Sequence, residues 1–147
     1  MKPRVLLVDD DEKFVYYLSE RLINREYDVT TSLSGEDTIE KVTSYNFDVV
    51  ILDVLMPGMD GIQALREIKR IKPLTEVIML TGHASVESGI EGMKLGAYDY
   101  LMKPCEIQKL VSKINKAYVR KAEQEERIRA AKVAEIVLSP RSVLKKE

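Results

Sequence analysis

The chain is poor in the residues that build disulfide frameworks and most zinc sites. Its 147 residues include one cysteine, Cys105, and one histidine, His83. Cys105 has no partner for an internal disulfide, and zinc sites built on several cysteine or histidine ligands are excluded. A metal ion here would need oxygen ligands. This cysteine usage is typical of a reducing compartment, and we predict a cytoplasmic protein.

Long apolar segments are also missing. Uninterrupted aliphatic runs such as Val5–Val8 and Val49–Leu52 contain four residues, whereas a membrane-spanning helix needs ~20. The first run is followed at once by the acidic sequence Asp9–Glu12, so the amino terminus does not have the form of a signal peptide. We predict a soluble protein that does not interact with membranes.

Glycine, proline and an excess of charge of one sign are scarce as well. There are 7 Gly and 5 Pro, while 45% of the residues are hydrophobic and 32% are charged, as in globular domains rather than fibrous or disordered chains. The 23 Lys and Arg residues nearly balance 24 Asp and Glu residues, and the formal net charge is -1. Because no overall positive field would attract a polyanion, we predict no direct nucleic-acid partner.

Short apolar runs alternate with segments of helical spacing. The predicted strands are Arg4–Val8, Tyr27–Thr31, Asp48–Leu52, Val77–Leu80 and Tyr98–Met102. Between and after them, apolar residues recur three or four positions apart, which is the spacing of amphipathic helices. The pattern predicts five strand–helix units, and therefore an α/β domain with a parallel sheet.

Capping residues support these boundaries. Ser34–Asp37 has the form of a capping box, and Asp60 precedes the third helical segment. The fourth segment, Ser85–Leu95, starts at a candidate serine cap and contains Gly89 and Gly92, each of which costs about 1 kcal/mol relative to alanine in a helix. These glycines have two interpretations, namely close packing of the helix or a loose helix that takes part in a switch.

Polar residues follow the carboxyl ends of the predicted strands, which right-handed crossovers place on one edge of the sheet. Asp9 and Asp10 follow the first strand, Asp53 the third, Thr81 the fourth and Lys103 the fifth. Three carboxylates there would repel each other by roughly 4 kcal/mol per pair at ~4 Å and an effective dielectric of ~20, so they need a cation. Oxygen ligands suit Mg²⁺, and a hydroxyl and an ammonium opposite the metal suit a phosphoryl group. The residues therefore predict phosphoryl transfer onto a carboxylate.

Four motifs at these positions resemble those of response-regulator receiver domains of two-component signalling, the chemotaxis receivers among them. They are VDD with its acidic pair, LDVLMPGMDG around Asp53, VIMLTG with Thr81, and GAYDYLMKP with Tyr100 and Lys103. All four occur in the order and spacing of the family, over residues 4 to about 118. The stretch from Thr81 onward is most similar to receivers attached to sigma-54-type ATPase activators.

The resemblance implies a flavodoxin-like, doubly wound (βα)5 fold, a three-layer sandwich whose parallel sheet has the strand order 2-1-3-4-5. It also implies a Mg²⁺ cofactor. Asp10 would bind the ion directly and Asp9 through water. Asp53 and the backbone carbonyl of Leu55 would supply further ligands.

The resemblance also implies how the signal is received and passed on. Asp53 would accept a phosphoryl group from a sensor histidine kinase or a phosphotransfer protein, and Lys103 would pair with it. A cis peptide bond before Pro104 would aim this lysine at the pocket. Thr81 and Tyr100 would report the phosphoryl group, and the surface of the fourth helix, fifth strand and fifth helix would change to control an unidentified downstream protein.

The carboxyl-terminal part of the chain has a different pattern. Residues 120–129 are dominated by charge, and strong helix formers continue to Glu135, before Ser139–Pro140 ends the helix. We predict a receiver domain over residues 1–118 and a projecting, solvated helical extension and tail over residues 119–147. No Walker-type motif is present, and we expect no output domain. Any homodimer would use the fourth helix, fifth strand and fifth helix together with this extension.

Two other function classes fit parts of the pattern. A haloacid-dehalogenase-type phosphatase also uses an aspartate nucleophile with Mg²⁺, but it resembles DxDx[TV] after its first strand, which here ends in VDDDE. A receiver that serves only as a scaffold would not need the intact set of Asp10, Asp53, Thr81 and Lys103. We therefore predict a signalling domain rather than an enzyme that turns over a metabolite, and we place His83 at the pocket rim without a catalytic role.

Overall fold

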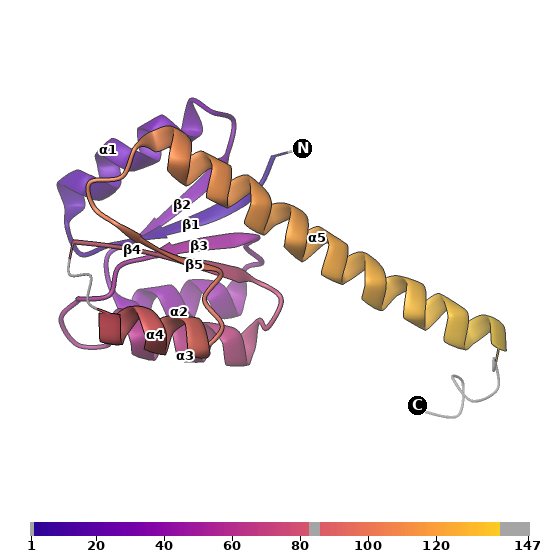
Figure 1. Cartoon of the computed structure of the whole chain (residues 1–147). Helices are drawn as coiled ribbons and strands as arrows, with labels where there is room; N and C mark the ends of the chain where they lie inside the picture. The colour runs from indigo at the N-terminus through magenta and orange to yellow at the C-terminus, as the bar shows by residue number, and fades with distance from the viewer. Residues whose placement is uncertain (1, 83–85, 139–147) are drawn as a thin grey trace.

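The computed structural model describes residues 2–82 and 86–138 (Figure 1). The strands in these ranges are β1 (Arg4–Val8), β2 (Asp28–Ser32), β3 (Val49–Leu52), β4 (Glu76–Thr81) and β5 (Asp99–Met102). The helices are α1 (Glu12–Ile23), α2 (Gly35–Ser44), α3 (Gly61–Ile71), α4 (Val86–Lys94) and α5 (Ile107–Leu138). The predicted alternation of strands and helices is confirmed.

All five strands are parallel and form one sheet in the order β2-β1-β3-β4-β5, as predicted. Helices α1 and α5 cover one face of the sheet, and α2, α3 and α4 cover the other, which gives three layers (Figure 1). The chain reverses its direction of winding between β1 and β3. Residues that follow these two neighbouring strands therefore meet at the carboxyl edge of the sheet, where ligands bind in folds of this kind.

Each face of the sheet has its own hydrophobic core, and β1 contributes to both. Val5 and Leu7 belong to the core under α1 and α5, whereas Leu6 and Val8 belong to the core over α2 and α3. Because successive side chains of a strand point to opposite faces, a strand buried on both sides must be apolar throughout. Burial of each such side chain stabilises the fold by about 1.5–3 kcal/mol, so these runs determine which segments form the sheet.

Side-chain caps begin the helices near the carboxyl edge. Asp60 and Gln63 form a capping box at the start of α3. Ser34 caps α2 by accepting from the Asp37 amide at 3.1 Å, but the Asp37 carboxylate accepts from Ser32 at 2.7 Å instead of completing the predicted box. The predicted serine cap at Ser85 lies outside the described residues.

Helix α5 continues well past the body of the domain, so the predicted projecting helix is confirmed (Figure 1). Its predicted stop at Ser139–Pro140 falls outside the described residues.

The expected solvation of residues 120–129 is wrong at Lys121, which is only 6% exposed and pairs with Asp48 at 3.2 Å. Buried carboxylates need cations, and α5 supplies two, because Arg120 also pairs with Glu76 at 2.8 Å. The division of the chain at residue 118 stays a prediction.

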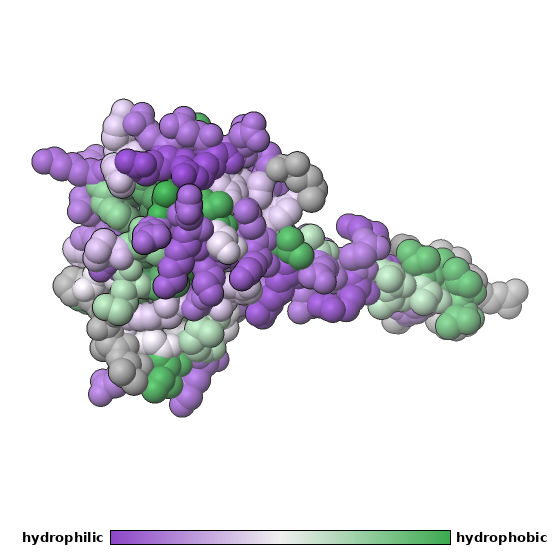
Figure 2. All heavy atoms as spheres, turned by 45° about the horizontal axis from the view of Figure 1, so that its top comes forward, coloured by the Kyte–Doolittle hydropathy of each residue, from purple (hydrophilic) through white to green (hydrophobic). Residues whose placement is uncertain are grey.

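Apolar side chains become frequent again near the end of α5, where they are exposed to solvent (Figure 2). Val133, Ile136, Val137 and Leu138 are each between 49% and 80% exposed. In the part of the chain that the structure describes, no helix is both long enough and apolar enough to cross a bilayer.

Candidate functional site

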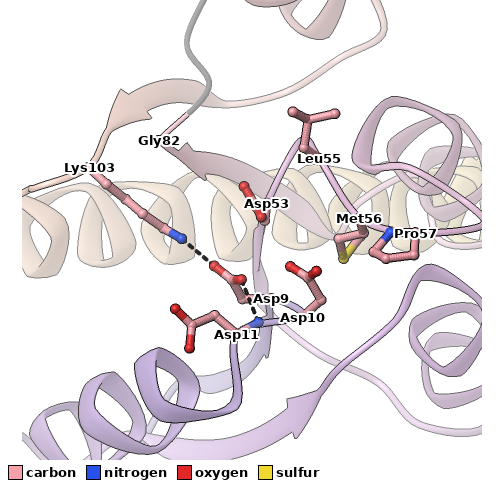
Figure 3. A pocket seen from close by; sticks show the side chains of 9 residues that line it. All are labelled: Asp9, Asp10, Asp11, Asp53, Leu55, Met56, Pro57, Gly82 and Lys103. Carbon is pink, nitrogen blue, oxygen red and sulfur yellow. Dashed lines mark hydrogen bonds and ion pairs between the residues drawn. The ribbon is translucent and has the colours of Figure 1, made fainter.

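A polar pocket lies at the carboxyl edge of the sheet, above the ends of β1 and β3 (Figure 3). It is lined by Asp9, Asp10, Asp11, Asp53, Leu55, Met56, Pro57, Gly82 and Lys103. The predicted convergence of residues from separate strand ends is therefore present. His83, expected at the rim of this pocket, lies outside the described residues.

Three carboxylates meet in this pocket. One oxygen atom from each of Asp9, Asp10 and Asp53 lies within 4.8 Å of the others. Asp9 and Asp53 are only 2% and 4% exposed, whereas Asp10 is exposed. Burial, and next the charge of Asp9, raise the pKa of Asp53 above its ordinary value. A divalent cation bound by these oxygens would offset this repulsion, and the donor set is of the type that Mg²⁺ prefers.

The loop after β3 is held in place by a close approach of backbones. A Cβ atom at Gly61 would lie 2.0 Å from the carbonyl oxygen of Asp53, so no other residue fits there without a shift. The Gly61 amide donates to the Val54 carbonyl at 2.7 Å, and the Val54 amide donates to the Asp53 carboxylate at 2.9 Å. These contacts fix the Asp53 side chain relative to the start of α3. Leu55, two residues farther on, is half exposed at the mouth of the pocket (Figure 3).

Lys103 points into the pocket from the loop after β5 (Figure 3). Its ammonium group donates to the Asp9 carboxylate, and it also lies 4.0 Å from the centroid of the Phe14 ring. The peptide bond between Lys103 and Pro104 is cis, as the family resemblance implied.

Thr81 contacts Asp53 of the pocket, and Tyr100 contacts α4. Thr81 is fully buried at the end of β4, and a hydrogen bond from its hydroxyl lowers the pKa of Asp53, partly opposing the effect of burial. Tyr100 on β5 is half-buried against the core that faces α3, and its hydroxyl lies 2.7 Å from Ser88 Oγ of α4. These two contacts therefore connect the end of β3 to β4, and β5 to α4.

The two glycines of α4 are not required by close packing. A Cβ at Gly89 would lie 3.6 Å from the Tyr100 ring, and one at Gly92 would lie 3.8 Å from Met79, which are ordinary van der Waals distances. Among residues 87–94, Gly92 alone is buried. These facts favour the interpretation of α4 as a loosely attached helix.

Two contacts of this region, and one at the opposite edge of the sheet, were not predicted from the sequence. Phe14 has the helical spacing of a core residue of α1 and packs against the core, and the structure places its ring beside Lys103 as well. The contact of Ser88 was not predicted, because its partner Tyr100 lies on another element, β5, and sequence spacing does not show which elements meet. The burial of Lys121 was missed for the same reason. The position of Phe14 in the first turn after the acidic loop is the one signal that could have indicated its contact.

Comparison with known proteins agrees with this geometry. The Response regulator receiver domain family matches residues 5–115. The transcriptional regulatory protein ZraR of Escherichia coli K12 is 40% identical over 113 residues, which are 77% of this chain and 26% of ZraR. The chain thus spans about a quarter of the length of this curated relative.

Two solved receiver structures are similar over nearly their whole length. A response regulator receiver domain protein from Clostridium thermocellum has 36% identity and a TM-score of 0.79, with 83% of this chain and 98% of that chain covered. A CheY-like receiver domain protein from Methanospirillum hungatei has 27% identity and a TM-score of 0.81, with 84% and 99% covered.

Proposed function

The chain belongs to the response regulator receiver domain family, and from this premise we propose that Asp53 accepts a phosphoryl group from a sensor histidine kinase or a phosphotransfer protein. One observation carries the proposal: a buried carboxylate at the end of β3 shares a pocket with two further carboxylates and a lysine. In the reaction, a carboxylate oxygen of Asp53 forms a bond to phosphorus while the bond from phosphorus to the donor imidazole nitrogen breaks. The imidazole leaves with a proton, and Asp53 becomes an acyl phosphate.

We propose that Asp9, Asp10 and Asp53 hold Mg²⁺, with the backbone carbonyl of Leu55 as a further ligand. The mutual closeness of the three carboxylates and the burial of two of them support this assignment. A bound Mg²⁺ ion would neutralise charge on the carboxylates and on the transferred group. We place Asp10 in direct contact with the ion and Asp9 in contact through water.

Lys103 and Thr81 are the groups that we assign to the phosphoryl oxygens. A phosphoryl group adds about 1.5 to 2 negative charges at neutral pH, and Lys103 is the lysine that lines the pocket. The Thr81 hydroxyl already donates to Asp53 and can turn to a phosphoryl oxygen attached to the same carboxylate. Both groups therefore meet the added charge without a large movement of the backbone.

We propose that the switch passes through Thr81 and Tyr100 to the surface formed by α4, β5 and α5, which then binds or releases an unidentified downstream protein. The strand that carries Thr81, β4, pairs directly with the strand that carries Tyr100, β5. The two switch residues therefore lie on neighbouring strands. The loose attachment of α4 supports a movement of this part of the domain. In this role the chain is a signalling domain whose chemistry is limited to its own phosphorylation and dephosphorylation.

A homodimer is a further element of the proposal. The exposed apolar residues near the end of α5 form a short seam only, and stable coiled coils need apolar positions sustained over three or four heptads. We therefore assign any association to α4, β5 and α5 together with the extension over residues 119–147. We propose no direct contact with nucleic acid or membrane.

Intact mass spectrometry tests the acceptor. The full chain is incubated with acetyl phosphate, with and without Mg²⁺, and should gain one phosphoryl group in the presence of the ion. Asp53→Asn should remove the labelling, and Asp10→Ala should raise the Mg²⁺ concentration that is needed. Asp11→Asn is the matched control, because it changes a carboxylate of the same pocket lining and keeps the α1 cap. Labelling of the Asp53→Asn variant at the wild-type rate would refute the assignment.

A further inference from the structure

The Lys103 ammonium has two neighbours of different kinds. One is the Asp9 carboxylate, to which it donates a hydrogen bond, and the other is the Phe14 ring, whose centroid lies 4.0 Å away. The Lys103 side chain is 22% exposed, so much of it is shielded from water. A cation above an aromatic face is attracted to it, and this attraction strengthens as water is removed.

These contacts are part of a closed ring of interactions. The Asp9 carboxylate accepts from the Asp11 amide at 3.0 Å, and the Asp11 carboxylate accepts from the Phe14 amide at 3.2 Å. The Phe14 ring faces Lys103, and Lys103 returns to Asp9. Because the Asp11 cap fixes the backbone of Phe14, the position of the ring is set by the same loop that carries the acidic pair.

We propose that Phe14 is a positioning residue that holds the Lys103 ammonium at the pocket independently of Asp9. The proposal rests on the assigned role of Lys103 in phosphorylation. Asp9 is a carboxylate that we assign to the metal site, so the lysine and the ion compete for it. A hydrocarbon ring does not bind Mg²⁺ in this way, and Phe14 therefore remains a partner of Lys103 when Asp9 is engaged.

The two neighbours of the Lys103 ammonium do not use all of its hydrogen-bond donors. An ammonium group has three N–H donors, of which one is directed to Asp9 and one faces the ring. The remaining donor is available to a phosphoryl oxygen on Asp53. Without the ring, the flexible four-carbon stem of lysine would have more orientations open to it. Loss of the aromatic face should therefore slow phosphorylation by between twofold and tenfold, without abolishing it.

Three full-length variants separate the ring from the rest of the side chain. Phe14→Leu keeps an apolar side chain against the core and removes the aromatic face, while Phe14→Tyr keeps the face. Tyr17→Leu is the matched control, because it removes another aromatic contact with a cation on the same helix, that with Arg21 at 4.4 Å, away from the pocket.

The first measurement is the NMR shift of the Lys103 side-chain methylene protons in metal-free, unphosphorylated protein. Ring current should shift these protons upfield in the wild type, in Phe14→Tyr and in Tyr17→Leu, and the shift should be lost in Phe14→Leu. An unchanged shift in Phe14→Leu would overturn the proposal. This measurement uses no phosphodonor, so it stands even if the wild type fails to become labelled, a result that would refute the acceptor role of Asp53 instead.

The second measurement is the rate of phosphorylation by acetyl phosphate at saturating Mg²⁺. We expect Phe14→Leu to lower the maximal rate, Phe14→Tyr to restore it, and Tyr17→Leu to match the wild type. The same change is then made in a Lys103→Met background, where Phe14→Leu should have no further effect. An equal decrease in that background would show that Phe14 acts without Lys103, and would also overturn the proposal.

Discussion

Lys121 is the residue whose replacement tests most directly how α5 is attached to the domain. Its ammonium is buried between Asp48, at 3.2 Å, and Glu125, at 3.1 Å. In Lys121→Met an apolar side chain of similar length fills the same space, but Asp48 loses one of its two cations. The variant therefore changes the charge balance at the amino edge of the sheet and leaves the pocket at the opposite edge untouched.

The size of the effect follows from the partners that remain. Removing one member of a buried ion pair costs about 3–5 kcal/mol when the other charge is left alone. Asp48 would still accept from the Arg4 amide at 2.8 Å and from the Arg4 guanidinium at 3.1 and 3.3 Å. We therefore expect a loss of about 1.5–3 kcal/mol, the range for one hydrogen bond to a charged group. For a domain of this size, the midpoint of thermal unfolding should fall by roughly 3–10 °C.

The pH dependence of this loss gives a sharper test. Burial by itself would raise the pKa of Asp48, but hydrogen bonds from Arg4 and Lys121 outweigh it and hold the pKa below its ordinary value. Such a carboxyl stabilises the fold above its unfolded pKa of ~3.9, and this contribution is lost as the pH falls through the folded pKa. The deficit of Lys121→Met should thus be complete at pH 7 and shrink below pH ~4.

The assay is thermal and urea unfolding, followed by circular dichroism, of the full chain at pH 7 and at several values below pH 4. Lys132→Met is the matched control, since Lys132 is an exposed lysine farther along the same helix. Equal stability of the two variants at pH 7 would refute the reasoning. So would a deficit of Lys121→Met that stays constant across the whole pH range.

Two further predictions concern the switch and the extension. Ser88→Ala and Tyr100→Phe should each speed hydrogen exchange of the α4 amides by up to about tenfold, because each removes the same hydroxyl contact. The double variant should exchange no faster than either single variant, and Ser112→Ala, at an exposed position, should have no effect. Additive effects of the two single variants would contradict this contact as the cause. In sedimentation, the full chain should associate more strongly after phosphorylation than before, and a chain ending at Arg127 should associate less. Equal masses in all samples would dismiss dimerisation through the part of the extension that follows Arg127.

The architecture and the pocket could be predicted because they depend on features that are local in sequence. A strand such as β1 is apolar at every position because both of its faces are buried, and this pattern is visible without the fold. Right-handed crossovers then place the residues after β1 and β3 at one edge. The predicted closeness of Asp9 and Asp53 thus needed no knowledge of side-chain contacts.

The missed contacts depend on partners that are distant in sequence. Lys121 stands in a charged stretch that is typical of a solvated helix face, and only the position of Asp48 explains its burial. Phe14 has the helical spacing of a core residue, and it is packed against the core. Its contact with Lys103 joins two residues that are distant in sequence, which periodicity cannot reveal.

The two aspartates at the ends of β3 show how the fold separates stability from chemistry. Asp48 precedes the strand and Asp53 follows it, and both are buried. Asp48 is paired with Arg4 and Lys121, and its pKa is lowered, so its ionised form stabilises the fold at neutral pH. Burial and the charge of Asp9 raise the pKa of Asp53.

When the pKa of an acid is higher in the folded chain than in the unfolded chain, its ionised form destabilises the fold at neutral pH. This destabilisation disappears as the pH falls and the acid becomes protonated. At Asp53 the charge of Lys103 relieves only part of this destabilisation, because the Lys103 ammonium donates its hydrogen bond to Asp9. A cation that binds at this end of β3 can therefore stabilise the domain, whereas the charges at the other end are already compensated. By linkage, a cation that binds this end of β3 only in the folded domain would raise the stability of that domain, and Asp48 at the other end offers no comparable gain.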